Sequence, residues 1–434
     1  NNLMTMMEKL ENELYKSFQF NSNNSNECNK LLNNEHNFLK LCKKVNSFFF
    51  NIKNEQGIAR ISILVIMHTY YKLLASVKNF ISKNNIKLDQ DDYLQKIIIE
   101  NKQDDFKNLC NIVYQKLDEE NKVKVMLYQI YFFCIHNDYE SSIKLFNISN
   151  VFEVISVFKD ENLKILFNRT LAQLGLCAFK NLDLEEELRC LTPLCNKGST
   201  KLKDYLSQSY IKENEKNALF DKNDKKRIIP YIMKINTDDL ETIFYLASMI
   251  NEGPKILLDK LTGEESEYVS DKTFGRTFFN FQKQQFNGPS HVDKDKILAT
   301  TTILMKGDWR SCIEEIKQLN LIKKYNFLHN KLLQLIKRTS LKCYIIFYMK
   351  EFESFEVGKL SKRFELEQSE IKKIINDMIL RGKLKAKWNK NYLNIKSNER
   401  DSIITVRKLV DNIQTIAQQN LELMQAALAC TNNE

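Results

Sequence analysis

Glycine and proline are scarce in this chain, which has only 10 glycines and 4 prolines among its 434 residues. Turns rely on these two residue types, so an all-β protein of this size would need many more of them. Long stretches without helix breakers favour a nearly all-helical protein. The sequence has 10 cysteines but no C-x-x-C pair, and most of the thiols fall within apolar runs. We therefore expect no disulfide framework and a reducing compartment, the cytoplasm.

Long uncharged apolar runs are also missing, since none reaches the ~18 residues that a membrane span requires. The 5 histidines are scattered, and none belongs to an H-E-x-x-H motif or is paired with cysteine at metal spacing. The phosphate-binding loops G-x-x-x-x-G-K-S/T and G-x-G-x-x-G are absent, as is the nucleophile motif G-x-S-x-G. The sequence therefore predicts no catalytic residues, no metal, no cofactor, no small-molecule substrate and no membrane contact.

Residues 340–396 follow the order helix, turn, helix, hairpin, which is typical of a winged helix. Val357, Leu360 and Phe364 share one helical face, and a third helix is predicted to begin with Ser369 as its N-cap. This helix should end before Gly382, because glycine readily adopts the left-handed conformation that closes a helix. We therefore predict a winged helix that ends in a two-stranded wing.

Apolar and basic residues alternate from Lys383 to Trp388, as in a strand with one buried face. Residues 389–391 would turn the chain, and residues 392–395 would return beside the first strand. An open strand edge is a template for pairing with another protein. The residues predicted to form an interface with another protein at this edge are Lys383, Lys385, Trp388, Tyr392 and Leu393.

The winged helix is also strongly basic, with eight lysines and arginines against two acidic residues between positions 369 and 396. The whole chain carries a net charge of +10, which permits a polyanionic partner without requiring one. The residues predicted to bind RNA are Lys372, Lys373, Arg381, Lys387 and Lys390. Two alternatives stay open: a solvated basic face beside a protein-binding edge, and a competing basic surface on the early helices. That second surface would consist of Lys40, Lys43, Lys44, Lys53 and Arg60.

A helix junction occurs twice in nearly the same form, as Asn137-Asp138-Tyr139 and as Gly307-Asp308-Trp309. Asparagine and glycine tolerate the left-handed position at a helix end, and aspartate caps the helix that follows. The aromatic residue is expected to lie between the two helices. A looser copy lies at Leu182-Asp183. Recurrent helix–turn–helix units predict a degenerate solenoid of the TPR or HEAT kind.

The C-terminal segment from 401 to 430 is predicted to be one long helix with an apolar stripe. Such a stripe needs a partner, either helices of other proteins or the chain's own solenoid. The residues predicted to enter a helical bundle are Val406, Leu409, Val410, Ile413, Ile416, Ala417, Asn420, Leu421 and Met424.

The predicted fold class is therefore all-α: a TPR/HEAT-like solenoid, then a winged helix, then a long C-terminal helix. The predicted domains are residues 1–105 (first solenoid helices), 106–338 (helical repeats), 339–396 (winged helix) and 397–434 (bundle helix). Within the repeats, a helix beginning at Thr237 is expected to end at Gly253-Pro254, because proline breaks helices.

A solenoid followed directly by a winged helix resembles the plan of PCI-domain proteins, and several stretches narrow the resemblance. These stretches are similar to the C subunit of eukaryotic translation initiation factor three. They are residues 66–72 (IMHTYYK), 168–179 (NRTLAQLGLCAF), 235–241 (INTDDLE), 306–312 (KGDWRSC) and 417–421 (AQQNL). The acidic N-terminal region of that family has no counterpart here.

The resemblance implies a non-enzymatic scaffold of the translation preinitiation complex. Its implied partners are the other subunits of the factor, above all the A subunit, which is also a PCI protein, and the small ribosomal subunit with its proteins and rRNA. Two other classes stay open on the residues alone. One is a PCI scaffold of the proteasome lid or the signalosome, and the other is a DNA-binding winged-helix regulator.

Overall fold

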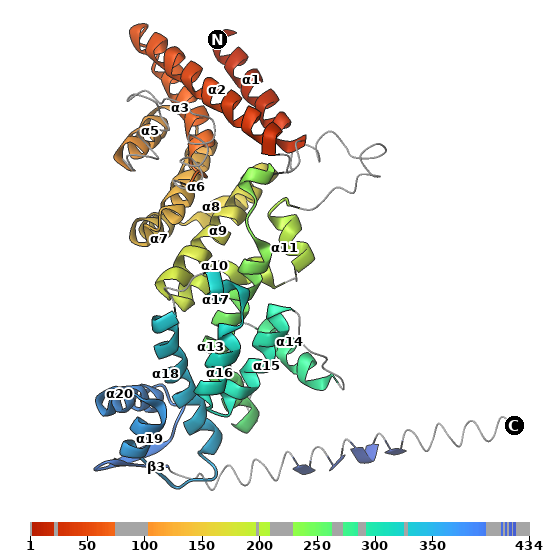
Figure 1. Cartoon of the computed structure of the whole chain (residues 1–434), viewed down its shortest axis with the longest axis vertical. Helices are drawn as coiled ribbons and strands as arrows, with labels where there is room; N and C mark the ends of the chain where they lie inside the picture. The colour runs from red at the N-terminus through yellow and green to blue at the C-terminus, as the bar shows by residue number, and fades with distance from the viewer. Residues whose placement is uncertain are drawn as a thin grey trace, which may run out of the picture. The chain divides into compact units, whose positions relative to one another are not determined.

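A computed structural model describes most of the chain (Figure 1). The described residues are 2–20, 25–73, 103–196, 199–208, 229–262, 272–284, 292–324 and 329–395, with nine positions between 409 and 421. The chain divides into two compact units, residues 1–247 and 248–434. In the described part of the chain, no helix has the length and hydropathy of a membrane span.

The first unit consists of helices that contact their neighbours in sequence and the next helices along. They are α1 (Asn2–Phe20), α2 (Ser25–Asn51), α3 (Glu55–Thr69), α5 (Gln103–Lys116), α6 (Glu119–Ile135), α7 (Tyr139–Ile148), α8 (Val151–Val157), α9 (Glu161–Asn181), α10 (Leu184–Cys195) and α11 (Ser199–Tyr205), then a short 3₁₀ turn, η3 (Tyr231–Met233), and the start of α13 (Thr237–Thr262). The central helix is α6, which packs on α3, α5, α7 and α9.

Aromatic side chains fill much of this core. Phe106 of α5 stacks on Phe132 of α6 with ring centroids 4.1 Å apart, and both are fully buried. Tyr70, just after α3, lies against Tyr128 and Tyr131 of α6. Consecutive layers thus bury a continuous apolar core, as expected of a solenoid. The predicted all-α class with a helical solenoid is confirmed.

The predicted helix junctions have one shared geometry. Asn137, Leu182 and Gly307 all have positive φ angles, of 59°, 61° and 80°. The aspartate that follows each of them caps the next helix, accepting hydrogen bonds from backbone N–H groups in its first turn. A fourth junction, which the sequence analysis missed, joins α2 to α3 with Lys53 in the left-handed position and Asn54 as the cap. One local device therefore joins four helix pairs.

Helix α13 corrects the prediction that Gly253-Pro254 ends it, because it continues to Thr262. Proline inside a helix removes one backbone hydrogen bond and costs about 3 kcal/mol. Here the helix buries Ile250 before the proline and Ile256 and Leu257 after it. Burying each such side chain contributes about 1.5–3 kcal/mol, so packing outweighs the break.

The second unit combines the last helix pairs with the winged helix. It contains the end of α13, then α14 (Lys272–Lys283), α15 (Asp293–Met305), α16 (Trp309–Lys317), α17 (Asn320–Lys324), α18 (His329–Tyr348), β1 (Ser354–Glu356), α19 (Val357–Phe364), α20 (Gln368–Leu380), β2 (Ala386–Asn389) and β3 (Tyr392–Ile395). The predicted winged helix is confirmed. Its third helix begins one residue before Ser369, with Glu367 as the N-cap, and the Ser369 hydroxyl donates to that glutamate.

The wing is a three-stranded antiparallel sheet in the order β1-β3-β2. Strand β1 was not predicted, because three residues are too few to show alternation. Phe355 of β1 lies opposite Leu393, and Trp388 of β2 lies opposite the same residue from the other side. Strand β3 is therefore the central strand, and β1 and β2 are the two edges.

Candidate functional site

Strand β2 is one of the two edges of the wing sheet, and the structure changes which of the predicted residues can form an interface there. Leu393 is 0% exposed on the central strand, so the prediction that it lies at the edge is wrong. Its neighbours on both sides occupy the positions where a partner strand would pair. Tyr392 is 48% exposed although it lies on the same strand. Lys385 is exposed just before β2, and Lys387 is exposed within it.

Trp388 is half-buried rather than free at the edge. Its indole Nε1 donates a hydrogen bond of 2.7 Å to the Asn376 side chain of α20. The residue therefore fixes β2 on α20 while part of its ring stays accessible. Lys383 lies before the strand and is also half-buried, so it does not belong to the paired edge.

The residues predicted to bind RNA lie on α20 and on the hairpin. Lys373, Arg381, Lys387 and Lys390 are exposed, and Lys372 is half-buried. Arg381 is paired with Asp377 at 2.8 Å, one turn earlier on the same helix. The other four lysines form no ion pair with any described residue, so their charges are available to a polyanion.

A second group of basic residues was missed by the sequence analysis, because its members come from distant parts of the chain. Lys255 of α13, Lys342 of α18 and Arg381, the C-cap of α20, all act on the charge of Lys383, which lies between α20 and β2. Burial lowers the pKa of Lys383, and the charges of Lys255, Lys342 and Arg381 lower it further. Burial likewise lowers the pKa of Lys342; Asp377 opposes this shift and Arg381 adds to it.

The stretch 306–312 connects the helical part of the second unit to the winged helix. The indole of Trp309 donates to the backbone oxygen of Arg363 at 2.9 Å, at the end of α19. The ammonium of Lys337 lies 4.3 Å from the Trp309 ring centroid and 2.8 Å from a carboxylate oxygen of Glu365. Arg310 contacts the other oxygen of Glu365 at 3.1 Å. The aromatic residue of this junction therefore reaches past its own helix pair to hold α19.

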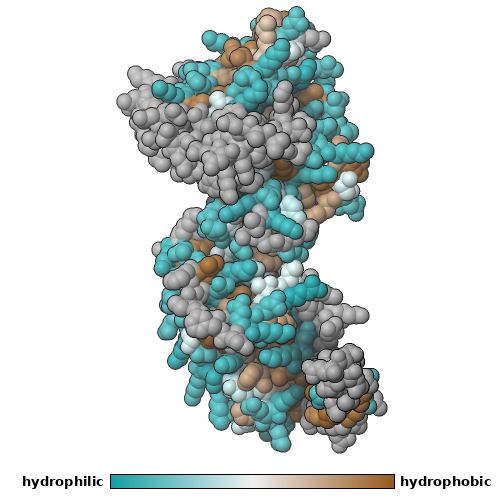
Figure 2. All heavy atoms as spheres, turned by 90° about the vertical axis from the view of Figure 1, so that its right-hand side faces the viewer, coloured by the Kyte–Doolittle hydropathy of each residue, from teal (hydrophilic) through white to brown (hydrophobic). Residues whose placement is uncertain are grey.

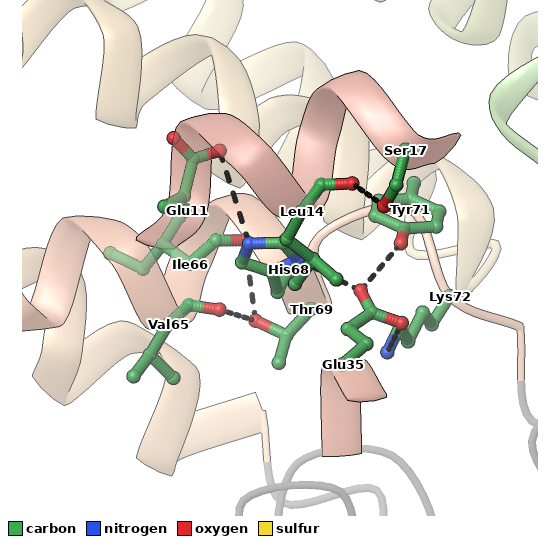
Figure 3. Close-up of polar contacts among 10 residues, drawn as sticks. All are labelled: Glu11, Leu14, Ser17, Glu35, Val65, Ile66, His68, Thr69, Tyr71 and Lys72. Atoms are coloured by element: carbon green, nitrogen blue, oxygen red, sulfur yellow. Dashed lines mark hydrogen bonds and ion pairs between the residues drawn. The ribbon is translucent and has the colours of Figure 1, made fainter. Parts of the chain in front are cut away.

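The stretch 66–72 supplies most of a buried polar cluster in the first unit (Figure 3). Glu35 of α2 is fully buried and accepts hydrogen bonds of 2.8 Å from His68 Nδ1, the Tyr71 hydroxyl and Lys72 Nζ. Burial alone would raise the pKa of Glu35, but the Lys72 charge and the hydrogen bonds lower it to about 2. The His68 ring also lies 4.0 Å from a carboxylate oxygen of Glu11 on α1. This cluster joins the first three helices, and its burial suits it to structure rather than catalysis.

The stretch 168–179 has a similar role around α9. Arg169 is 1% exposed, and its guanidinium donates to the backbone oxygen of Met233 at 2.7 Å and to the Tyr131 hydroxyl at 3.3 Å. Gly175 lies so close to Leu191 of α10 that an added Cβ would come within 2.6 Å of its side chain. These residues hold α6, α9, α10 and η3 together.

Among the residues that the structure describes, no group of three or more His, Cys, Asp or Glu is placed to hold a metal ion. The side chains of eight cysteines are described, and all eight are buried and outside disulfides. Burial raises the pKa of Cys42 and of Cys312 to about 12, so these thiols are inert at neutral pH.

The predicted bundle residues are described only between 409 and 421. Leu409, Val410, Ile413, Ile416 and Leu421 are helical and between 47% and 59% exposed. Ala417 and Asn420 are exposed as well. Val406 and Met424 lie outside the described residues. On the face of the molecule drawn in Figure 2, hydrophilic residues cover most of the described surface and apolar residues form smaller groups.

Comparison with known proteins matches most of the chain. Residues 1–260 match the family described as "Eukaryotic translation initiation factor 3 subunit 8 N-terminus", and residues 309–396 match the PCI domain. The chain is 30% identical over 326 residues to the C subunit of eukaryotic translation initiation factor 3 from Neosartorya fischeri, covering 74% of this chain and 37% of the relative. It is 25% identical over 442 residues to the protein of the same name from Caenorhabditis briggsae, covering 98% of this chain and 46% of the relative. The chain thus spans less than half the length of these two relatives.

Proposed function

The chain belongs to the C-subunit family of eukaryotic translation initiation factor 3, and from this premise we propose that it is a non-enzymatic scaffold of that factor. The observation that carries the proposal is the match of residues 1–260 and 309–396, which together cover both the solenoid and the winged helix. The scaffold would act in the cytoplasm by assembling with other subunits, above all the A subunit with its own PCI domain. It would also bind proteins and rRNA of the small ribosomal subunit.

The relatives named above favour this family over the alternatives of a scaffold in the proteasome lid or the signalosome. They also disfavour a DNA-binding regulator. The chemistry of the described residues is compatible with a scaffold, because their buried polar groups connect helices rather than converge on a substrate. We further propose that the scaffold is organised in four parts: the first solenoid helices (1–105), the helical repeats (106–338), the winged helix (339–396) and the bundle helix (397–434).

We propose that strand β2 pairs with, or packs against, the winged helix of a neighbouring subunit. It is one of the two edges of the wing sheet; Lys387 within it is exposed, as are Lys385 just before it and Tyr392 on the adjacent strand. Exposed strand edges are recognised through their unpaired N–H and C=O groups, and side chains then give specificity. Lys383 would contribute charge beside this edge rather than pair with a partner strand.

Tagged protein should sediment with the other subunits through a sucrose gradient, with mass spectrometry identifying its companions. Trp388→Asp should release the neighbouring subunit, because a charge at β2 disrupts an apolar contact. Asn376→Ala is the matched control, since it removes only the hydrogen-bond acceptor of the Trp388 indole. If both variants retain the neighbouring subunit fully, the edge is merely solvated and this interface is wrong.

The predicted RNA-binding residues Lys372, Lys373, Arg381, Lys387 and Lys390 form the second part of the proposal. Four of them are exposed on α20 and the hairpin, where a phosphate backbone could approach. The early basic residues Lys44, Lys53 and Arg60 are exposed too, so they remain a competing surface. Charge reversal of each set, followed by sedimentation with small ribosomal subunits, would distinguish the two surfaces.

A further inference from the structure

Helix α2 packs on the rest of the first unit through one side only. Phe38, Cys42, Val45 and Phe49 are buried on that side, and α2 contacts α1 and α3 (Figure 1). The opposite side is exposed at positions 30, 34, 37, 41, 44 and 48. These positions follow one another in alternating steps of four and three residues, which is the spacing of a helix face that packs along a second helix.

The exposed side of α2 carries an apolar stripe toward the end of the helix. Leu41 is 38% exposed, Phe48 is 50% exposed and Ile52 is 57% exposed. The three positions are seven and four residues apart, so they share one helical face. Ile52 follows the last residue of α2, and its backbone N–H donates to the Phe48 carbonyl oxygen at 3.2 Å, as it would within a helix. We call Leu41, Lys44, Phe48 and Ile52 the α2 face.

The aromatic residue of the α2 face is supported from below. The Phe48 ring centroid lies 5.8 Å from that of Phe49, which is buried. Phe49 in turn lies so close to Gly57 of α3 that an added Cβ would come within 2.9 Å of its ring. A partner would therefore meet a supported apolar surface, which lowers the entropy lost when the two bind.

Positive charge surrounds the α2 face. Lys30, Lys44 and Lys53 are exposed and Lys40 is half-buried, whereas the one acidic residue between positions 30 and 54 is Glu35, which is 0% exposed. The exposed and half-buried carboxylates of the neighbouring helices α1 and α3 already pair with cations: Glu8 with Arg60, Glu13 with Lys16 and Glu55 with Lys116. The charge that complements this surface must therefore come from a partner.

We propose that the α2 face binds an acidic amphipathic helix of another protein. Apolar residues of that helix would cover Leu41, Phe48 and Ile52, and its carboxylates would meet Lys40 and Lys44. Opposite charges that flank an apolar seam determine which helices pair. This inference goes beyond the proposed scaffold function and does not depend on it.

Other occupants fit the α2 face less well. A second copy of the chain, paired across a two-fold axis, would bring the lysines of both copies together, and like charges repel. A nucleic-acid strand would gain from the lysines and from Phe48, but Leu41 and Ile52 offer neither a stacking plane nor a charge. The combination of aliphatic residues, helical spacing and positive charge favours an acidic helix.

The test measures binding of two labelled synthetic peptides to the whole chain by fluorescence anisotropy. The acidic peptide of about 21 residues has leucine at two positions of each heptad and glutamate at the flanking positions, and the basic peptide has lysine in place of glutamate. We expect the chain to bind the acidic peptide at least about tenfold more tightly than the basic one. This preference should shrink as the salt concentration rises from about 0.05 to about 0.5 M.

The apolar stripe is tested by the double variant Phe48→Ser/Ile52→Ser. It should weaken binding of the acidic peptide about tenfold, because the exposed parts of two apolar side chains are no longer covered on binding. The matched control Ile148→Ser/Val157→Ser removes two side chains that are 83% and 77% exposed at the ends of α7 and α8. This control should change the affinity less than about twofold.

The charge of the α2 face is tested by Lys44→Glu, which should reverse the preference in favour of the basic peptide. Lys362→Glu, at an exposed position of α19, should leave the preference for the acidic peptide unchanged. The charge variant decides the matter if the serine variant unfolds, since a reversed preference requires a folded chain.

Equal affinity for the two peptides would overturn the proposal, as would no binding of either at about 100 µM chain. Equal weakening by the two serine variants would also overturn it, because the effect would then be general hydrophobicity. Displacement of the acidic peptide by a single-stranded RNA of about 20 nucleotides, or by anionic phospholipid vesicles, would assign the α2 face to nucleic acid or to a membrane instead. Dimerisation of the wild-type chain that Phe48→Ser/Ile52→Ser abolishes would assign it to a second copy.

Discussion

At the scale of single residues, the buried carboxylate of Glu35 allows a direct test of how an ion pair in the core contributes to stability. Its carboxylate holds His68, Tyr71 and Lys72, and Lys72 is itself buried. Glu35→Gln would leave the Lys72 ammonium without a counter-ion, and we expect the free energy of unfolding to fall by about 3–5 kcal/mol. Urea unfolding at neutral pH measures this loss. Glu13→Gln, which removes an exposed carboxylate paired with Lys16, should cost less than about 1 kcal/mol.

The pH dependence of stability follows from the same residue. The pKa of Glu35 is lowered from 4.5 to about 2 on folding, so its contribution is present above pH 4.5 and is lost as pH falls toward 2. The wild type should therefore lose stability over this window more steeply than Glu35→Gln. Equal slopes for the two proteins would contradict the assignment of a charged, buried Glu35.

For Glu187 of α10 we expect the opposite dependence of stability on pH. It is fully buried, and neither carboxylate oxygen has a hydrogen-bond partner among the described residues. Burial raises its pKa well above the ordinary value, and Asp183 raises it further. A raised pKa means that stability is complete below pH 4.5 and declines as pH rises toward the folded-state pKa.

We therefore expect Glu187→Met to stabilise the protein at pH 8 by about 1–3 kcal/mol, the usual cost of an unsatisfied buried polar group. The gain should shrink as the pH falls toward and below 4.5, where the wild-type carboxyl becomes protonated in the unfolded state as well. Thermal unfolding at several pH values measures it. Glu185→Met, at an exposed position of the same helix turn, should give no gain at any pH.

At the scale of secondary-structure elements, two glycines end helices in the same left-handed conformation but in different surroundings. Gly307 has a φ of 80°, and a Cβ there would lie 2.7 Å from the Tyr344 Cβ. Gly382 has a φ of 70° and nothing within 4 Å of the added atom. Gly382→Ala should cost only the backbone penalty of about 1–2 kcal/mol. Gly307→Ala should cost about 1–3 kcal/mol more, because of the steric overlap.

Chemical denaturation of the two glycine variants provides the comparison. A similar loss at both positions would show that Tyr344 moves aside without cost. The larger loss at Gly307 would confirm that the junction, with Asp308 and Trp309, fixes the winged helix against α18 through close backbone contact.

Local signals in the sequence predicted these elements where the relevant residues are adjacent. The junctions at Asn137-Asp138 and Gly307-Asp308 could be recognised because capping needs only a few consecutive residues. Strand β1 was missed because its formation depends on β3, nearly forty residues later in the chain. The end of α13 was placed wrongly because packing on both sides of Pro254 outweighs the local break.

Distant contacts explain what the site predictions missed. Glu35 meets His68 across 33 positions, and Arg169 meets Met233 across 64. No spacing rule links such residues, although the stretches that contain them had suggested the family. Leu393 was placed at the wing edge because the third strand was unknown. The alternating Leu384, Ala386 and Trp388 were nevertheless correctly assigned to the more buried face.

At the scale of the whole molecule, each of the two compact units is built of packed helices that are joined by polar contacts of its own. The solenoid in the first unit and the winged helix in the second each carry their own connecting residues, Glu35 and Arg169 in one and Trp309 with Glu365 in the other. The surfaces available for partners are thus separate from the residues that maintain the fold. Substitutions at β2 or in the C-terminal segment should therefore affect assembly more than stability.

The C-terminal segment provides the most direct test of that separation. Its described residues Leu409, Ile413 and Ile416 expose 56–58% of their surface, and an exposed apolar stripe favours association. We expect removal of all residues after Lys396 to leave the thermal unfolding midpoint unchanged and to weaken association with the companion subunits. The double variant Ile413→Asp/Ile416→Asp should weaken the association in the same way. Gln414→Asp/Gln418→Asp, which changes exposed polar positions in the same turns, should not weaken association.

Limited proteolysis should cleave this segment in the isolated chain and spare it in the complex. Equal protection in the isolated monomer would mean that the segment docks on its own chain, and the proposed bundle would be wrong.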